Sequence, residues 1–247
     1  MNFIEIPNLP AKKVHTVLVD CRISEHAIEG LRVLGIIAVK SRIMHALYPA
    51  VSGHPDMQLH HFGGTVFCCA PEAYAHYSRI LPGADLRVGK SALNRNYPFD
   101  IAYNVGRVGR FAFHKLNYTD TVIRAYYEEN GVNLIDVNQG YSKCSICPIA
   151  KNAMITSDIE IAKKADTIGI DVLFVSCKNI ILKGLSNGFI GGACGMLSDT
   201  MLGVNGNLEL HPDFEKIGRF CENYNVHIHA LHNGFIEDIG SIIPLSE

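Results

Sequence analysis

Residues 55–89, PDMQLHHFGGTVFCCAPEAYAHYSRILPGADLRVG, contain the pattern that decides the fold. The runs 55–62 and 65–70 are apolar and strand-like, and they follow each other without a helix between them. A helical pattern then covers 71–81, and 84–89 predicts one more short strand. This stretch therefore predicts a unit with the order strand, strand, helix, strand.

The same order recurs along the chain. A second unit covers 101–137, with a helix that begins after Thr119-Asp120 and ends at Gly131. A third unit covers 141–176 and a fourth covers 188–231. This regular repetition is typical of an architecture built from similar units.

A fifth unit is split between the two ends of the sequence. It starts at 237–245, where the chain ends, and its missing pieces are a strand at 14–20, a helix at 24–35 and a strand at 36–40. Joining the two ends completes the unit and closes a ring, which removes exposed sheet edges. We predict that 14–40 pack beside 238–245.

The first strands of the units begin at regular intervals. These unit heads lie near His54, Asn104, Cys144, Gly191 and Asp238, with steps of 50, 40, 47 and 47 residues. A doubly wound α/β sheet is the competing interpretation, but it predicts one strand per helix, whereas two strands precede most helices here. We predict one α/β domain over 1–247, a five-bladed pseudo-symmetric propeller of ββαβ units closed by the N- and C-terminal segments.

Composition narrows the classes of function. The formal net charge is −2 and the basic residues form no run, so neither nucleic acid nor an anionic membrane is expected as a partner. The N-terminal residues lack a secretory pattern, and no apolar stretch reaches membrane-spanning length. Most of the eight cysteines lie in apolar strand-like runs, so we expect reduced thiols and a cytoplasmic location.

With this pattern the chain resembles the pentein fold of arginine and agmatine deiminases, dimethylarginine hydrolases and amidinotransferases, and a bacterial group of unknown activity that carries the same fold. In those families an acidic head, a His-x-Asp head and a cysteine carry the chemistry. Glu237-Asp238-Ile239-Gly240, His54-Pro55-Asp56 and Gly140-Tyr141-Ser142-Lys143-Cys144 resemble these three segments, in an order that fits after circular permutation. The double glycine of the family's acidic head lies instead at Gly191-Gly192, beside Cys194.

The resemblance implies catalytic roles for Cys144, His54 and Asp238. Cys144 would attack a guanidinium carbon, and the adjacent Lys143 is expected to lower the pKa of its thiol. His54 would protonate the leaving group and then deprotonate the hydrolytic water. His-Pro-Asp is a weak signal, however, because it occurs again at 211–213, where it opens a helix.

Five residues besides Asp238 are candidates for substrate binding. Carboxylates match the paired N–H groups of a guanidinium, so Asp56, Glu237 and Asp238 are candidates for a clamp. Glu237 and Asp238 point to opposite faces of a strand, and we expect Asp238 to face the channel. Asn104 and the small residues Gly191 and Gly192 could let a substrate approach the backbone, although glycines in strands also mark bulges.

Other site types fit the sequence less well. Cys144 and Cys147 form a single CxxC, without the second ligand pair that zinc requires or the helix start that redox pairs use. The histidines at 227, 229 and 232 lack a supporting carboxylate pattern. We therefore predict no metal, nucleotide or flavin cofactor.

Two hypotheses of function remain. The first is a cysteine-dependent hydrolase or deiminase that acts on a small guanidine-like substrate, as a monomer or homodimer. The second is a non-catalytic ring that binds or assembles with a partner. They differ in whether Cys144, His54 and Asp238 converge on one side of the central channel.

Overall fold

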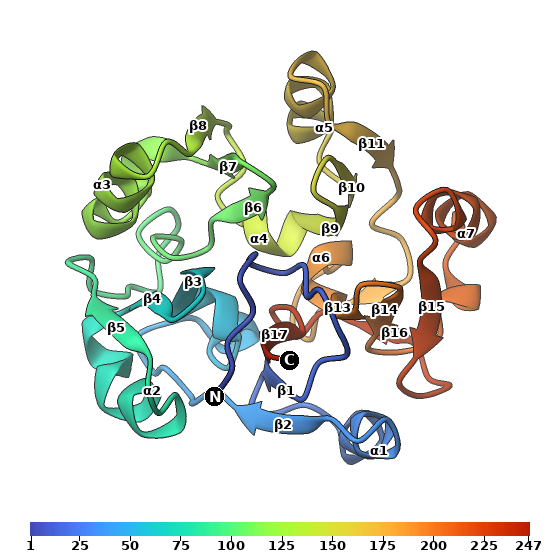
Figure 1. Cartoon of the computed structure of the whole chain (residues 1–247), viewed down its shortest axis with the longest axis horizontal. Coiled ribbons are helices and arrows are strands. Elements are labelled where there is room, and N and C mark those ends of the chain that lie inside the picture. The colour runs from blue at the N-terminus through green and yellow to red at the C-terminus, as the bar shows by residue number, and fades with distance from the viewer.

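The computed structural model describes all residues 1–247 and is a mixed α/β fold built from small sheets. Five of the sheets have three strands, and their helices lie at the periphery of the molecule (Figure 1). In each, the middle strand pairs antiparallel with the first strand and parallel with the third. The helix connects the middle strand to the third, as the repeated sequence pattern predicts.

Four of these sheets follow each other along the chain. Each of them forms one unit with the helix between its second and third strands. The first two units are β3 (Leu59–Gly63), β4 (Val66–Cys69), α2 (Tyr74–Ile80) and β5 (Asp85–Val88), and then β6 (Gly106–Val108), β7 (Phe111–His114), α3 (Thr121–Glu129) and β8 (Asn133–Asp136). The next two are β9 (Ile146–Ala150), β10 (Ala153–Thr156), α5 (Ile159–Thr167) and β11 (Asp171–Phe174), and then β13 (Cys194–Ser198), β14 (Met201–Val204), α7 (Phe214–Glu222) and β15 (His227–Ala230).

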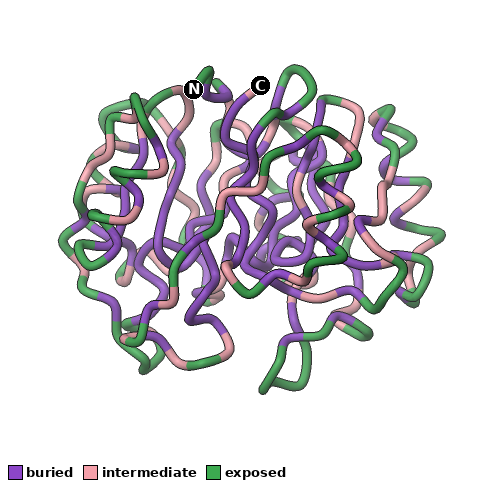
Figure 2. Tube along the Cα trace, turned by 90° about the horizontal axis from the view of Figure 1, so that it is seen from below, coloured by how far each residue is buried: buried purple, intermediate pink, exposed green.

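The fifth three-stranded sheet joins the two ends of the chain. Its strands are β17 (Ile243–Ser246), β1 (Thr16–Val19) and β2 (Ile37–Lys40), with α1 (Glu25–Val33) between the last two. β17 pairs antiparallel with β1, and both termini lie on the same side of the molecule (Figure 2). The prediction that 14–40 pack beside 238–245 is confirmed.

Polar residues begin several of the peripheral helices. Ser24, Asp120 and Asp158 accept hydrogen bonds from backbone N–H groups in the first turns of α1, α3 and α5. Such caps satisfy donors that a helix leaves unpaired at its start. None of the helices is both long and apolar enough to cross a membrane.

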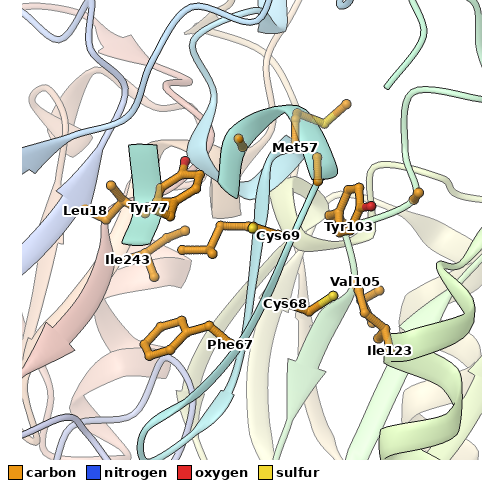
Figure 3. Close-up of a cluster of buried hydrophobic side chains, with 14 of the residues drawn as sticks. Leu18, Met57, Phe67, Cys68, Cys69, Tyr77, Tyr103, Val105, Ile123 and Ile243 are labelled. Carbon is orange, nitrogen blue, oxygen red and sulfur yellow. The ribbon is translucent and has the colours of Figure 1, made fainter. Parts of the chain in front are cut away.

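The core lies between the small sheets and their helices. In the largest cluster Phe67, Cys68 and Cys69 of β4 pack near Tyr77 of α2 and near Tyr103 (Figure 3). Burial raises the pKa of the Cys69 thiol to about 12, so this thiol behaves as a small apolar side chain.

Short segments at the centre of the molecule precede the first strands. They include the 3₁₀ helix η2 (Pro55–Met57) before β3, α4 (Ser142–Ser145) before β9, and α6 (Ile190–Ala193) before β13. A two-stranded sheet of β12 (Ile180–Ile181) and β16 (Ile236–Glu237) leads to Asp238. Because the first strands lie innermost (Figure 1), these segments bring the unit heads together.

Candidate active site

The predicted catalytic residues converge on one cavity, although they come from three distant parts of the sequence. His54 precedes η2, Cys144 belongs to α4, and Asp238 follows β16. All three line a cavity of ≈ 210 Å³, and none is more than 3% exposed. The structure therefore places them in reach of a common small molecule.

Cys144 is held by two polar neighbours. Its thiol donates to Asp56 Oδ2 at 3.0 Å, and Asn104 Nδ2 donates to the sulfur at 3.3 Å. The Asn104 amide also accepts from the backbone N–H of Lys143 at 2.9 Å. Asn104, predicted to bind substrate, thus contacts the segment of Cys144 and does not line the cavity.

The expectation that Lys143 lowers the pKa of Cys144 is wrong. Its ammonium donates to Ser241 Oγ at 2.9 Å, and Ser241 in turn donates to Asp56 Oδ2, the oxygen that also accepts from the thiol. Burial raises the pKa of the Cys144 thiol well above its ordinary value, and the charges of Asp56 and Asp238 raise it further. Cys144 at rest is therefore a neutral thiol.

His54 lies between two carboxylates. Its Nε2 is 3.9 Å from Asp20 Oδ2, and its Nδ1 is 4.0 Å from Asp238 Oδ1. Nδ1 is buried without a hydrogen-bond partner, and Asp56 Oδ1 is in the same condition. Buried polar groups nearly always have a partner, so these two atoms leave hydrogen-bonding capacity for a ligand.

Asp238 is fixed by its own backbone surroundings. One oxygen accepts from the N–H of Phe189 at 2.9 Å and the other from the N–H of Gly240 at 3.0 Å. Gly240 has a φ of +67°, which favours glycine. Burial raises the pKa of the Asp238 carboxyl, while the nearby His54 and the two N–H groups oppose that rise.

The glycine pair serves close packing within the protein. A Cβ at Gly192 would overlap the Asp238 carboxylate, and one at Gly191 would overlap the carbonyl of Ile146 and lie 2.7 Å from that of Cys144. Neither glycine lines the cavity, which differs from the prediction that they admit substrate to the backbone. These positions are small because Asp238 and the segment of Cys144 lie directly against them.

A second hollow of ≈ 150 Å³ adjoins the first, and His54 and Asp238 border both. Glu237, a predicted binding residue, lines only this second hollow and pairs with Lys183 at 2.7 Å. Asp238 lines the cavity of Cys144 and Glu237 does not, as expected from their alternation along the chain.

Sequence reasoning missed Asp20 and Arg22. Asp20 directly follows β1, is 1% exposed, and binds Arg22 in a two-bond fork with a shortest N–O distance of 2.6 Å. Arg22 also donates to the carbonyls of Pro49 and Ala50, which fixes the loop before His54. A carboxylate at the end of an apolar strand was the available signal.

The charges around His54 favour a bound cation. Asp20, Asp56 and Asp238 are three buried carboxylates. The nearby cations are Arg22, paired with Asp20, Lys143, which reaches Asp56 only through Ser241, and Lys183, paired with Glu237. The ligand atoms of His54, Asp56 and Cys144 lie within 4.8 Å of one another, a spacing that a metal ion could also use. The absence of a required metal stays a prediction.

Comparisons with known proteins give the family and the fold. Residues 18–243 match the profile of the Family of unknown function (DUF6873). No curated protein sequence matches the chain.

Several solved structures share the fold at very low sequence identity. An amidinotransferase of the saxitoxin biosynthetic pathway from Microseira wollei has a TM-score of 0.59 and 11% identity, covering 97% of this chain and 96% of that one. An agmatine deiminase from C. jejuni with substrate bound has a TM-score of 0.54 and 9% identity, covering 98% of this chain and 96% of that one. DDAH from Pseudomonas aeruginosa in complex with citrulline has a TM-score of 0.52 and 8% identity, covering 88% of this chain and 92% of that one.

Proposed function

The chain is a pentein-fold member of the Family of unknown function (DUF6873), and we propose that it is a cysteine-dependent hydrolase of a small guanidine or amidine compound. The observation that carries this proposal is the convergence of Cys144, His54 and Asp238 on one cavity. The solved structures with this fold include an amidinotransferase, a DDAH and an agmatine deiminase. We also propose that 1–247 form one five-bladed propeller domain.

The substrate head would bind as a cation among the buried carboxylates. A guanidinium presents paired N–H groups, and carboxylates accept such pairs in a two-bond fork. Asp238 is the acceptor that lines the cavity, and Asp56, which contacts the Cys144 thiol but does not line the cavity, offers the unpartnered Oδ1 as a second acceptor. Because Asp56 contacts the Cys144 thiol, the same binding places the guanidinium carbon near the sulfur.

Binding of the cation would also activate the thiol. The charges of Asp56 and Asp238 contribute to the raised pKa of Cys144, and a guanidinium between them offsets that contribution. The thiol proton then passes to Asp56 Oδ2, 3.0 Å away. The resulting thiolate is the nucleophile, formed when the substrate is present.

The reaction then proceeds in two halves. A C–S bond forms as the thiolate attacks, and a C–N bond breaks as protonated His54 gives its proton to the leaving ammonia or amine. Neutral His54 next takes a proton from water, whose oxygen attacks the same carbon. The C–S bond breaks, Asp56 returns its proton to the sulfur of Cys144, and the new hydroxyl group loses its proton to solvent, so one water is consumed and one amine is released.

The competing hypothesis is a ring that only binds a partner. Such a ring would have no reason to bring a thiol, a histidine and a carboxylate to the same small cavity. The residues are also buried, which suits a small ligand better than a protein surface. Convergence therefore favours an enzyme.

A screen of guanidine compounds for release of ammonia or amine tests the proposal. We expect turnover by the wild type and a loss of at least about 1000-fold in Cys144→Ser, because the nucleophile is removed. Cys177→Ser, at a half-buried thiol outside the cavity, is the matched control and should retain activity. Full activity of Cys144→Ser, or release from no guanidine at all, would contradict the proposal.

A further inference from the structure

The wall of the Cys144 cavity carries charged and polar residues at its inner end and becomes largely apolar farther out. Beyond His54, Cys144 and Asp238, the lining consists mainly of apolar and aromatic residues, with two small polar ones. They are Tyr48, Val51, Tyr141, Leu182, Leu185 and Phe189, together with Ser186 and Asn187. No lysine or arginine belongs to this lining.

The tyrosine hydroxyl groups are already engaged inside the protein. Tyr141 donates to Asp100 Oδ2 at 2.7 Å, and the Tyr48 and Tyr141 hydroxyls lie 3.4 Å apart. What these residues can offer to a ligand is therefore chiefly their rings. An apolar group gains free energy when it leaves water for such a surface, whereas a charged group loses it.

The cations that line the adjoining hollow are also engaged. Arg22 uses its guanidinium on Asp20 and on backbone carbonyls, and Lys183 pairs with Glu237 at 2.7 Å. Both line the adjoining hollow, where Asp20, Glu237 and Asp238 outnumber them. A substrate carboxylate would find no free cation in either place and would meet a negative surface in the second.

We propose that the substrate is a guanidine that carries an uncharged, apolar substituent, such as a short alkyl or aryl group, and is not an amino acid. The charged inner end of the cavity holds the guanidinium, and the apolar wall holds the substituent. Leu185, which is 51% exposed, marks the outer end of that wall. This inference rests on the proposed function, because it assumes that the guanidinium occupies the inner end.

Three compounds with the same head and the same four-carbon chain test it. The last carbon carries only hydrogen in butylguanidine, an ammonium in agmatine, and an ammonium with a carboxylate in arginine. Calorimetry on Cys144→Ser measures binding without chemistry. We expect butylguanidine to bind at least about tenfold more tightly than either of the others, since only it buries no second charge.

The outcomes separate the two proposals. Equal or tighter binding of arginine or agmatine, or binding of none of the three, overturns the apolar-substituent inference. If butylguanidine binds best but the wild type does not hydrolyse it, the inference stands and the proposed hydrolase function fails. If it binds best and is hydrolysed, both stand.

A variant with a new cation at the outer wall sharpens the test. Leu185→Arg should improve the affinity for arginine relative to butylguanidine by at least about fivefold, because it supplies the missing partner for the carboxylate. Leu210→Arg is the matched control, at another exposed leucine that does not line the cavity, and should leave the ratio unchanged. An unchanged ratio in Leu185→Arg would show that the substituent does not reach this wall.

Discussion

The tripeptide His-Pro-Asp occurs twice in this protein, and its two copies lie in opposite surroundings. At 211–213, before α7, the ring of His211 donates to the Ser176 carbonyl and accepts from the N–H of Asp213. The Asp213 carboxylate binds Lys216 and the Ser176 N–H. At 54–56, where η2 begins, His54 Nδ1 and Asp56 Oδ1 are buried without a hydrogen-bond partner.

The difference shows that the fold supplies hydrogen-bond partners to the second copy and leaves two polar atoms of the first copy without them. The second copy, directly before α7, has its hydrogen bonds within the protein, so it needs no ligand. The first copy lies at the centre of the molecule beside a thiol and has hydrogen-bonding capacity left for a ligand. The same three residues therefore serve stability in one place and support a proposed reaction in the other.

Removing the imidazole from each copy should give the largest difference in turnover between the two. His54→Asn should lower turnover of the best guanidine substrate about 100-fold or more, because the proposed proton donor to the leaving group is lost. His211→Asn should leave turnover within about twofold. Steady-state assays of both variants measure this, with circular dichroism to show that both are folded. Similar losses in the two variants would remove the functional distinction.

Neutralising the carboxylate in each copy should give a smaller and more specific effect. Asp56→Asn removes a charge that raises the pKa of Cys144, so that pKa should fall toward its ordinary value. At pH 8 the free enzyme should then react with a small alkylating reagent several-fold faster at Cys144, while its affinity for guanidine drops about tenfold. Mass spectrometry of the labelled peptide and calorimetry measure the two effects.

Asp213→Asn provides the control for that experiment. It removes a carboxylate from an identical tripeptide that does not contact the cavity, so neither the labelling of Cys144 nor guanidine affinity should change. If Asp56→Asn labels no faster than the wild type, access to the buried thiol and not its ionisation limits the reaction. The proposed activation by substrate charge would then be wrong.

The repeated sheets could be predicted from the sequence because their signals are local. Alternating apolar runs, capped helices and a regular spacing identified the strand order of each unit, and the fragments at the two ends predicted the pairing of β1 with β17. What the sequence did not predict was that two unit heads form the short helices α4 and α6 instead of strand starts. Gly191 of α6 lies directly against the backbone carbonyls of Cys144 and Ile146, a contact between distant segments that has no local signal in the sequence.

The site was only partly predictable, since burial and distant pairing control its chemistry. The positions of Cys144, His54 and Asp238 followed from their places at unit heads. The contact of Lys143 with Ser241, 98 residues away, follows from closure of the chain and has no local signal. The raised pKa of the thiol depends likewise on burial, which a cationic neighbour in the sequence does not reveal.

The smallest expected effect concerns the contribution of His211 to stability. Burial lowers the pKa of His211, so the folded protein holds it neutral. His211→Ala removes its two hydrogen bonds and should lower the free energy of unfolding by about 1–3 kcal/mol at pH 7.5, measured by urea denaturation.

The pH dependence of that loss gives the final test. Because the folded pKa lies below the unfolded value, the stability linked to this neutral imidazole is present above the unfolded pKa of about 6.5 and is lost as the pH falls through the folded pKa. The difference between wild type and His211→Ala should therefore shrink by pH 5. A difference that grows toward acid would mean that His211 is charged in the fold. In that case the second His-Pro-Asp copy would hold an ion pair, and its contrast with the incomplete first copy would need another explanation.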